Sequence, residues 1–166
     1  NVIAFGNLPY NISTQILVNF INLKKWPPFY KKIIFMFQKE VADRILAKSK
    51  TKQYGRLTIL ANYRLDIVKS FNISKNSFFP VPAVDSKVIV FKPKLNIRYK
   101  INDVKNLEHI TNIFFSGKRK MINKPLARIF KNHISVSKRY KIDLNLRPSD
   151  LSLDQYYKLA EHYESD

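Results

Sequence analysis

The stretch NVIAFGNLPYNIST, residues 1–14, joins an apolar run to a polar and aromatic turn and then to a Ser-Thr pair. Residues 2–5 are typical of a buried β-strand, and Ser13 is a good N-cap for a helix with an apolar face of Ile16, Leu17, Phe20 and Ile21. The turn Asn7-Leu8-Pro9-Tyr10 therefore lies where a strand ends and a helix begins. Open α/β sheets place their ligand-binding residues at such positions.

Strand and helix signals continue to alternate through the first half of the chain. KKIIFMFQ (31–38) predicts a central strand and KEVADRILAK (39–48) a helix, and this β-α-β-α order is typical of a parallel sheet covered by helices. YGRLTILANYRLDIVKSFNI (54–73) and DSKVIVFKPK (85–94) are rich in β-branched and aromatic residues and predict a strand and a closing antiparallel strand. Pro80 and Pro82 exclude a central strand from the loop between them.

After residue 94 the pattern becomes helical. Asp103 can cap a helix carrying Val104, Leu107, Ile110 and Phe114, and Pro125 marks a kink or a new start within a second helical stretch, residues 117–131. Ser152 and Gln155 form a capping box for a last helix. The sequence therefore predicts an α/β unit over residues 1–97 and a small all-α unit over residues 98–166.

The charge of the chain predicts a polyanionic partner. Lys and Arg number 30 against 12 Asp and Glu, which gives a net charge of +18 and a pI near 10.1. A lysine-rich genome explains many lysines, but it does not explain why residues 92–147 hold only three carboxylates, Asp103, Glu108 and Asp143. Nucleic acid is the expected partner, and an anionic membrane surface is the less common alternative.

Several functional classes are excluded by composition. The chain has no cysteine, which excludes disulfides, zinc-thiolate sites and cysteine nucleophiles. Its three histidines are far apart, so we expect no metal site. No Ser-His-Asp arrangement or pair of carboxylates points to a hydrolase. No apolar run is long enough to span a bilayer and no secretory leader is visible, so we expect a cytoplasmic protein.

The turn at residues 7–10 has the chemistry of an adenine site. The Asn7 amide offers an acceptor and two donors without charge, and Leu8, which precedes proline, must be extended. Pro9 lacks an N–H group, so this short stretch has more backbone carbonyl acceptors than N–H donors, and Tyr10 adds a flat ring. Clustered acceptors beside an aromatic face suit a planar base with an exocyclic amine.

These residues carry a resemblance to a known family. GNLPYNIST (6–14), FQKEVADRI (37–45), YGRLTILANY (54–63) and FFPVPAVDS (78–86) occur in the order seen in the KsgA-type ribosomal RNA adenine dimethyltransferases. KRKMINKPL (118–126) and RPSDLSLDQYYKLA (147–160) resemble the helical tail of that family. The resemblance covers nearly the whole chain. It implies the C-terminal part of a Rossmann-like methyltransferase sheet followed by a small helical RNA-binding domain.

The resemblance also implies an activity, which is methyl transfer from S-adenosylmethionine to N6 of two adjacent adenosines near the 3′ end of small-subunit rRNA. Asn7 and the Leu8 or Pro9 carbonyl would bind the amine, and Tyr10 and Phe78 would stack on the two faces of the base, with Phe79 at a variable position. Asn7 would also touch the donor. Asp85 and Ser86 would hold the loop. The expected partner is small-subunit rRNA or a 30S precursor, bound by a monomer.

Phosphate binding is expected from a basic track. Lys118, Arg119 and Lys120 match an Arg-Arg-Lys triplet in the family, with lysine in the first place, where a point charge suffices but bidentate geometry is lost. A solvated helix face is the alternative explanation of this cluster. Weaker candidates for the track are Arg56, Arg128, Lys131, Lys138 and Arg139.

One part of the family pattern is missing. Such enzymes hold the donor on a glycine-rich turn after the first strand, and none of Gly6, Gly55 and Gly117 lies in such a motif. The chain also begins inside a strand-like run without Met. We therefore expect a piece of a longer enzyme, inactive by itself and with an exposed edge on its first strand. The alternatives are a non-catalytic rRNA-binding or ribosome-assembly protein and, less favoured, a methyltransferase of DNA or protein glutamine.

Overall fold

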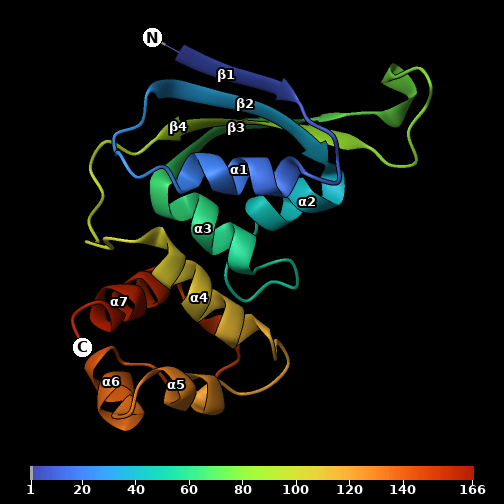
Figure 1. Cartoon of the computed structure of the whole chain (residues 1–166). Helices are drawn as coiled ribbons and strands as arrows, with labels where there is room; N and C mark the ends of the chain where they lie inside the picture. The colour runs from blue at the N-terminus through green and yellow to red at the C-terminus, as the bar shows by residue number, and fades with distance from the viewer. Residues whose placement is uncertain (1) are drawn as a thin grey trace.

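The computed structural model describes residues 2–166 as a four-stranded sheet with two successive layers of helices on one side of it (Figure 1). The strands are β1 (Val2–Asn7), β2 (Tyr30–Gln38), β3 (Leu65–Ile73) and β4 (Ser86–Pro93). The helices are α1 (Ser13–Ile21), α2 (Lys39–Ile45), α3 (Arg56–Arg64), α4 (Val104–Phe115), α5 (Asn123–Ile129), α6 (His133–Arg139) and α7 (Leu153–Tyr163), with short 3-10 turns η1 (Lys75–Ser77) and η2 (Pro148–Asp150). The predicted α/β class is confirmed.

The sheet order is β1-β2-β4-β3, with β1 and β2 parallel and the other two pairs antiparallel. The predicted central strand and the closing antiparallel strand are therefore confirmed. In the register, Asn7 lies opposite Met36 and Ser86 lies opposite Gln38. The carboxyl ends of β1 and β2 thus meet the amino end of β4 at one edge of the sheet.

The strand predicted over residues 54–73 is wrong in its first half, which forms helix α3. This helix contacts the other helices of its layer and α4 and α7 of the next, so nearly every side is covered. A helix buried all round lacks the polar face that makes the 3.6-residue period visible in sequence. Its buried residues are Thr58, Ile59, Leu60, Ala61, Tyr63 and Arg64. Only the second half, β3, is a strand as predicted.

Two expectations for the amino-terminal stretch are also wrong. β1 is not buried, because it pairs with β2 alone, and Ile3 and Phe5 are 56% and 78% exposed; the expected exposed strand edge is confirmed. Ser13 is not the N-cap. It is the first residue of α1, and its hydroxyl donates to the Tyr10 carbonyl oxygen at 3.2 Å.

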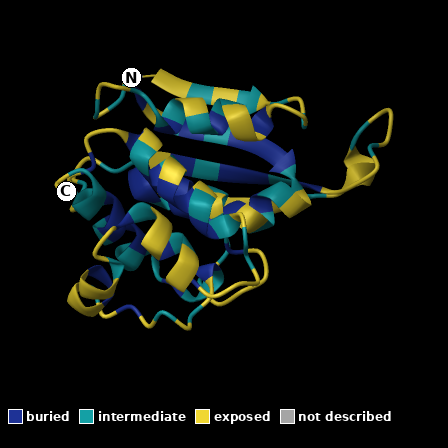
Figure 2. Ribbon diagram, turned by 60° about the horizontal axis from the view of Figure 1, so that its bottom comes forward, coloured by how far each residue is buried: buried dark blue, intermediate teal, exposed yellow. Residues whose placement is uncertain are grey.

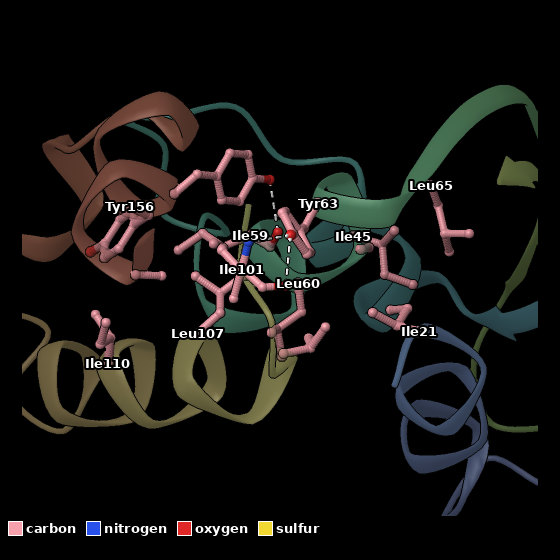
Figure 3. Packing of buried hydrophobic residues seen from close by; sticks show 14 of the residues in the cluster. Ile21, Ile45, Ile59, Leu60, Tyr63, Leu65, Ile101, Leu107, Ile110 and Tyr156 are labelled. Carbon is pink, nitrogen blue, oxygen red and sulfur yellow. Dashed lines mark hydrogen bonds between the residues drawn. The ribbon is translucent and has the colours of Figure 1, made fainter. Parts of the chain in front are cut away.

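The core continues from the sheet through α3 into the second helical layer (Figure 2). The Tyr157 hydroxyl of α7 donates to the Ile59 carbonyl oxygen of α3 at 2.9 Å, across the packing seen in Figure 3. The Tyr63 hydroxyl donates to the Tyr99 carbonyl oxygen at 3.1 Å, in the segment that leads to α4. Helix α3 therefore joins the two layers by polar as well as apolar contacts. The boundary between an α/β unit and an all-α unit at residues 97 and 98 stays a prediction.

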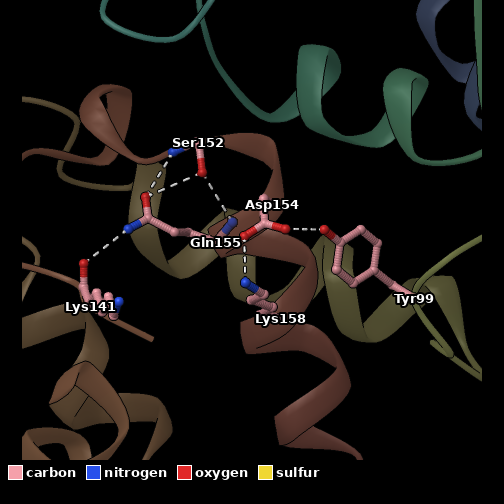
Figure 4. A network of polar contacts seen from close by, with 6 residues as sticks. All are labelled: Tyr99, Lys141, Ser152, Asp154, Gln155 and Lys158. Carbon is pink, nitrogen blue, oxygen red and sulfur yellow. Dashed lines mark hydrogen bonds and ion pairs between the residues drawn. The ribbon is translucent and has the colours of Figure 1, made fainter. Parts of the chain in front are cut away.

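The predicted helix starts in the second half are confirmed. The Asp103 carboxylate accepts from the Lys105 N–H at 2.9 Å, and Pro125 lies in the first turn of α5, so it marks a new start and not a kink. Ser152 and Gln155 form a reciprocal capping box on α7 (Figure 4). In the same network Asp154 accepts hydrogen bonds from Tyr99 and Lys158, and both lower the pKa of Asp154.

Arg64, at the end of α3, fixes the end of α1. Its Nη1 donates to the carbonyl oxygens of Ile21 and Leu23 at 2.7 and 2.8 Å, and its guanidinium lies 4.7 Å from the centre of the Trp26 ring. Arg64 is only 7% exposed. Burial of the guanidinium lowers the pKa of Arg64 from its ordinary value. A buried charge thus satisfies carbonyls that α1 leaves open at its end.

We expect Arg64→Met to lower the free energy of unfolding by about 2–4 kcal/mol, because the Ile21 and Leu23 carbonyls lose their donor in a buried place. Urea denaturation followed by circular dichroism measures the loss. The matched control is Arg98→Met at an exposed position. An equal effect of the two substitutions would contradict the anchoring role of Arg64.

Candidate functional site: an acceptor-rich turn and a basic cleft

The turn Asn7-Leu8-Pro9-Tyr10 connects the carboxyl end of β1 to α1. Asn7 and Pro9 are exposed, while Leu8 and Tyr10 are half-buried. A Cβ atom at Gly6 would lie 2.7 Å from Leu8 Cδ2, so glycine allows the Leu8 side chain to fold back against the strand. The turn therefore presents its polar groups at the sheet edge while Leu8 anchors it to the core.

Hydrogen bonds within the turn show which acceptors remain available. The Pro9 carbonyl accepts from the Ile12 N–H at 3.1 Å, and the Tyr10 carbonyl accepts from the Ser13 hydroxyl. No donor within residues 2–166 bonds to the Leu8 carbonyl or to the Asn7 side-chain amide. Between the two carbonyls considered from sequence, Leu8 is thus the one that accepts no hydrogen bond within residues 2–166.

Tyr10 is held in place by β4. Its hydroxyl lies 2.7 Å from the Ser86 Oγ, which is fully buried at the first residue of that strand. The neighbouring Asp85 carboxylate accepts from the Lys75 N–H at 2.9 Å, and the Asp85 carbonyl accepts from the Lys39 N–H at 2.9 Å. The prediction that Asp85 and Ser86 hold the loop is confirmed. Their contacts tie the turn, the 74–85 loop and α2 to one corner of the sheet.

Phe78 and Phe79 lie in the loop that Asp85 closes. Phe78 follows η1 and is half-buried, whereas Phe79 is fully exposed, at 101% of its reference area. Within residues 2–166 the rings of Tyr10 and Phe78 do not form a stacked pair with each other. Asp85 thus closes the loop that carries Phe78, and Ser86 holds Tyr10 at the amino end of β4, while the loop itself projects beyond the sheet (Figure 1).

The candidate phosphate ligands occupy different places. Arg56 and Lys118 line one cleft of about 800 Å³ between the first helical layer and α4, together with Arg44 and Lys52. Arg119 and Lys120 are exposed in the turn after α4. Arg128 is exposed in the last turn of α5 and does not line this cleft. Sequence reasoning missed Arg44 and Lys52. Lysines alternate with other residues at positions 48, 50 and 52, and this pattern could have indicated Lys52 as a candidate phosphate ligand.

Lys118 differs from the other two residues of its triplet. Its Nζ donates to the Lys52 and Tyr54 carbonyl oxygens, the latter at 2.9 Å. Partial burial, with the nearby Arg44 and Lys52 cations, lowers the pKa of Lys118. Two of its three N–H donors are therefore engaged by protein, whereas Arg119 and Lys120 are exposed to solvent.

Within residues 2–166 no group of three or more His, Asp or Glu side chains is placed to hold a metal ion. In the same range no helix combines the length and apolarity needed to cross a membrane.

Comparison with known proteins shows the family to which the chain is similar. The family model described as ribosomal RNA adenine dimethylase matches residues 1–165. The chain is 48% identical over 161 residues to the ribosomal RNA small subunit methyltransferase A of Pelagibacter ubique, which covers 97% of this chain and 61% of that protein. The enzyme of the same name from Buchnera aphidicola is 39% identical, over 95% of this chain and 56% of that protein. The chain thus spans about three-fifths of the length of these relatives.

Solved structures show the same fold. A dimethyladenosine transferase from Plasmodium falciparum superposes with a TM-score of 0.80 at 25% identity, over 98% of this chain and 66% of that chain. The 23S rRNA methyltransferase ErmE superposes with a TM-score of 0.65 at 19% identity, over 98% of this chain and 65% of that chain, which shows the fold alone. The Rossmann-like expectation for the sheet is confirmed by these neighbours.

The Tyr10–Ser86 contact can be tested by a double-mutant cycle. We expect Ser86→Ala to lower the free energy of unfolding by about 1 kcal/mol, because the 2.7 Å hydrogen bond is lost at a buried hydroxyl. In a Tyr10→Phe background Ser86→Ala should cost much less, since the bond is already absent. Equal costs of Ser86→Ala in both backgrounds, measured by urea denaturation, would show that the two hydroxyls are not coupled.

Proposed function

Because this chain belongs to the ribosomal RNA adenine dimethylase family, we propose that its protein methylates N6 of two adjacent adenosines near the 3′ end of small-subunit rRNA. S-adenosylmethionine is the proposed methyl donor, and small-subunit rRNA or a 30S precursor the proposed partner of a monomeric, cytoplasmic protein. The observation that carries the proposal is the turn after β1, where the Asn7 amide and the Leu8 carbonyl have open acceptors beside a Tyr10 held by Ser86.

The proposed chemistry depends on positioning. The N6 lone pair of adenine is delocalised into the ring, so the amine is a weak nucleophile. The Asn7 Oδ1 and the Leu8 carbonyl would accept its two N–H groups, favour a tetrahedral nitrogen and direct the lone pair toward the methyl carbon. Acceptors fixed before the reaction need no reorganisation during it. Both acceptors are neutral, so one N–H proton would pass to solvent as each methyl group is added, and the second transfer would use the one N–H that remains.

The base would be held by stacking after it leaves its own helix or loop. The Tyr10 ring, oriented by Ser86, would cover one face, and Phe78 would cover the other. Each such contact contributes roughly 1–3 kcal/mol, which offsets the cost of unstacking. Asp85 supports this arrangement, since it closes the loop that carries Phe78.

The residues of this chain fit one side of a donor site. Asn7 is exposed at the carboxyl end of an edge strand, where its amide can contact a donor as well as the base. When bound, S-adenosylmethionine supplies an electrophilic methyl group. We propose that residues 1–97 provide the base-binding half of the catalytic domain and residues 98–166 the RNA-binding domain. Since no glycine-rich donor turn occurs in this sequence, we expect residues 1–166 alone not to methylate RNA.

We expect Asn7→Ala in the full-length protein to lower dimethylation of undermethylated small-subunit particles by at least roughly 100-fold, because a positioned acceptor is lost at the reacting amine. RNA affinity should stay nearly unchanged, since the removed side chain is neutral. Transfer of radiolabelled methyl groups and a filter-binding assay measure the two quantities. Asn11→Ala, at an exposed asparagine of the same connection, is the matched control.

Undiminished methylation by the Asn7→Ala protein would contradict the role of Asn7. If the unsubstituted full-length protein binds the particles but transfers no methyl group, the alternative of a non-catalytic rRNA-binding protein is favoured instead.

A further inference from the structure

We propose that the α2–α3 loop, residues 48–55, is a phosphate-binding element for the RNA backbone and that Lys118 positions it without contacting RNA. This inference rests on the proposed function and extends it to Lys48, Lys50 and Lys52, which lie outside both the family motifs and the basic triplet. We call the side chains of Lys48, Lys50 and Lys52, together with that of Arg56 at the start of α3, the loop cations.

No carboxylate of the described residues neutralises the positive charge of the loop cations. The sequence from Leu46 to Arg64 contains no Asp or Glu. All four side chains are exposed, and the ion pairs formed within residues 2–166 include none of them. Of the two carboxylates that line the adjoining cleft, Glu40 is paired with Arg44 and Glu108 accepts from the Asn22 amide. Exposed cations without protein partners are available to phosphates.

The loop is held from the second helical layer at two points. The Lys50 N–H donates to the Ser149 carbonyl oxygen at 2.7 Å, with Lys50 in a left-handed conformation at a φ of 68°. The Lys118 Nζ bonds to the Lys52 and Tyr54 carbonyls, as described above. The middle and the carboxyl end of the loop are therefore fixed before any ligand binds, which lowers the entropy that binding would cost.

Tyr54 anchors the same loop by packing. It is buried, and its ring lies 6.4 Å from that of Phe115, near the end of α4. Phe115 comes just before the turn that carries Arg119 and Lys120, so the loop and the turn are attached to each other. Partial burial lowers the pKa of Lys118, and the Arg44 and Lys52 cations that converge there lower it further. An RNA backbone that contacts Arg119 and Lys120 can thus continue onto the loop cations.

The roles of the loop cations and of Lys118 predict different salt dependence. A cation that neutralises a phosphate contributes roughly 0.7–0.9 to the slope of log affinity against log salt concentration. We expect Lys48→Gln, Lys50→Asn and Lys52→Gln together to reduce that slope by about 2–3, with Asn chosen at 50 because it tolerates the left-handed conformation. The control with the same charge change is Lys24→Gln, Lys25→Gln and Lys31→Gln, in the exposed connection before and at the start of β2.

The positioning role of Lys118 predicts non-additivity. Lys118→Met should increase hydrogen exchange of the amides of residues 48–55 and weaken binding in the native background, but it should cost little affinity once the three loop lysines are replaced. Arg119→Ala should weaken binding equally in both backgrounds and leave the loop amides protected. The probe is a fluorescein-labelled RNA hairpin whose loop holds two adjacent adenosines, titrated with the full-length protein over a range of KCl concentrations.

Two results would overturn the inference. One is an unchanged salt slope when the three loop lysines are replaced, and the other is an equal loss of affinity for Lys118→Met in both backgrounds, which would make Lys118 a direct phosphate ligand. Replacement of Arg119 and Lys120 by Ala separates this failure from that of the proposed function. If the replacements of Arg119 and Lys120 reduce the salt slope and those of the loop lysines do not, only the inference about the loop is contradicted. If neither set of replacements reduces the salt slope, RNA binding by this face is contradicted as well.

Discussion

The burial of α3 between the sheet and the second helical layer is the constraint on which the rest of the structure depends. Its side chains face the core in nearly every direction, and its backbone accepts a hydrogen bond from Tyr157 of the last helix. Arg64 at its end satisfies the carbonyls of Ile21 and Leu23. A single helix thus connects the sheet, the end of α1 and the helical tail in one continuous core, so disturbing it would disturb all three.

The same arrangement relates the proposed catalytic turn to the basic surface. The turn at residues 7–10 precedes α1, and the loop cations precede α3, so the two helices of one layer carry the two functional features. Both features are held by long-range hydrogen bonds, from Ser86 to Tyr10 and from Lys118 to the α2–α3 loop. The loop cations and the turn at residues 7–10 therefore have fixed relative positions, as the proposed recognition of one site in a long polyanion would require.

The proposed chemistry and the proposed binding use different physical means. The turn offers neutral acceptors and aromatic rings, which distinguish an adenine amine by hydrogen-bond geometry and stacking. The loop cations, Arg119 and Lys120 offer charge, which would attract any phosphate backbone and carries little sequence information. Affinity can therefore come from the basic face and selectivity from the turn, so substitutions in one should leave the contribution of the other largely intact.

The sequence by itself determined the α/β class, β2, β4, the helix starts at Asp103 and Ser152, and the acceptor-rich turn, because these depend on local periodicity, capping and proline chemistry. It also identified Asp85 and Ser86 as loop-holding residues. Only the tertiary structure decided that residues 56–64 form a helix, that the Pro9 carbonyl accepts a hydrogen bond while the Leu8 carbonyl accepts none within residues 2–166, and that Lys118 donates to two carbonyls of the α2–α3 loop. These outcomes depend on partners distant in sequence. A helix buried on all sides has no polar face to reveal it, and a lysine gives no local sign of whether its partner is a carbonyl or a phosphate.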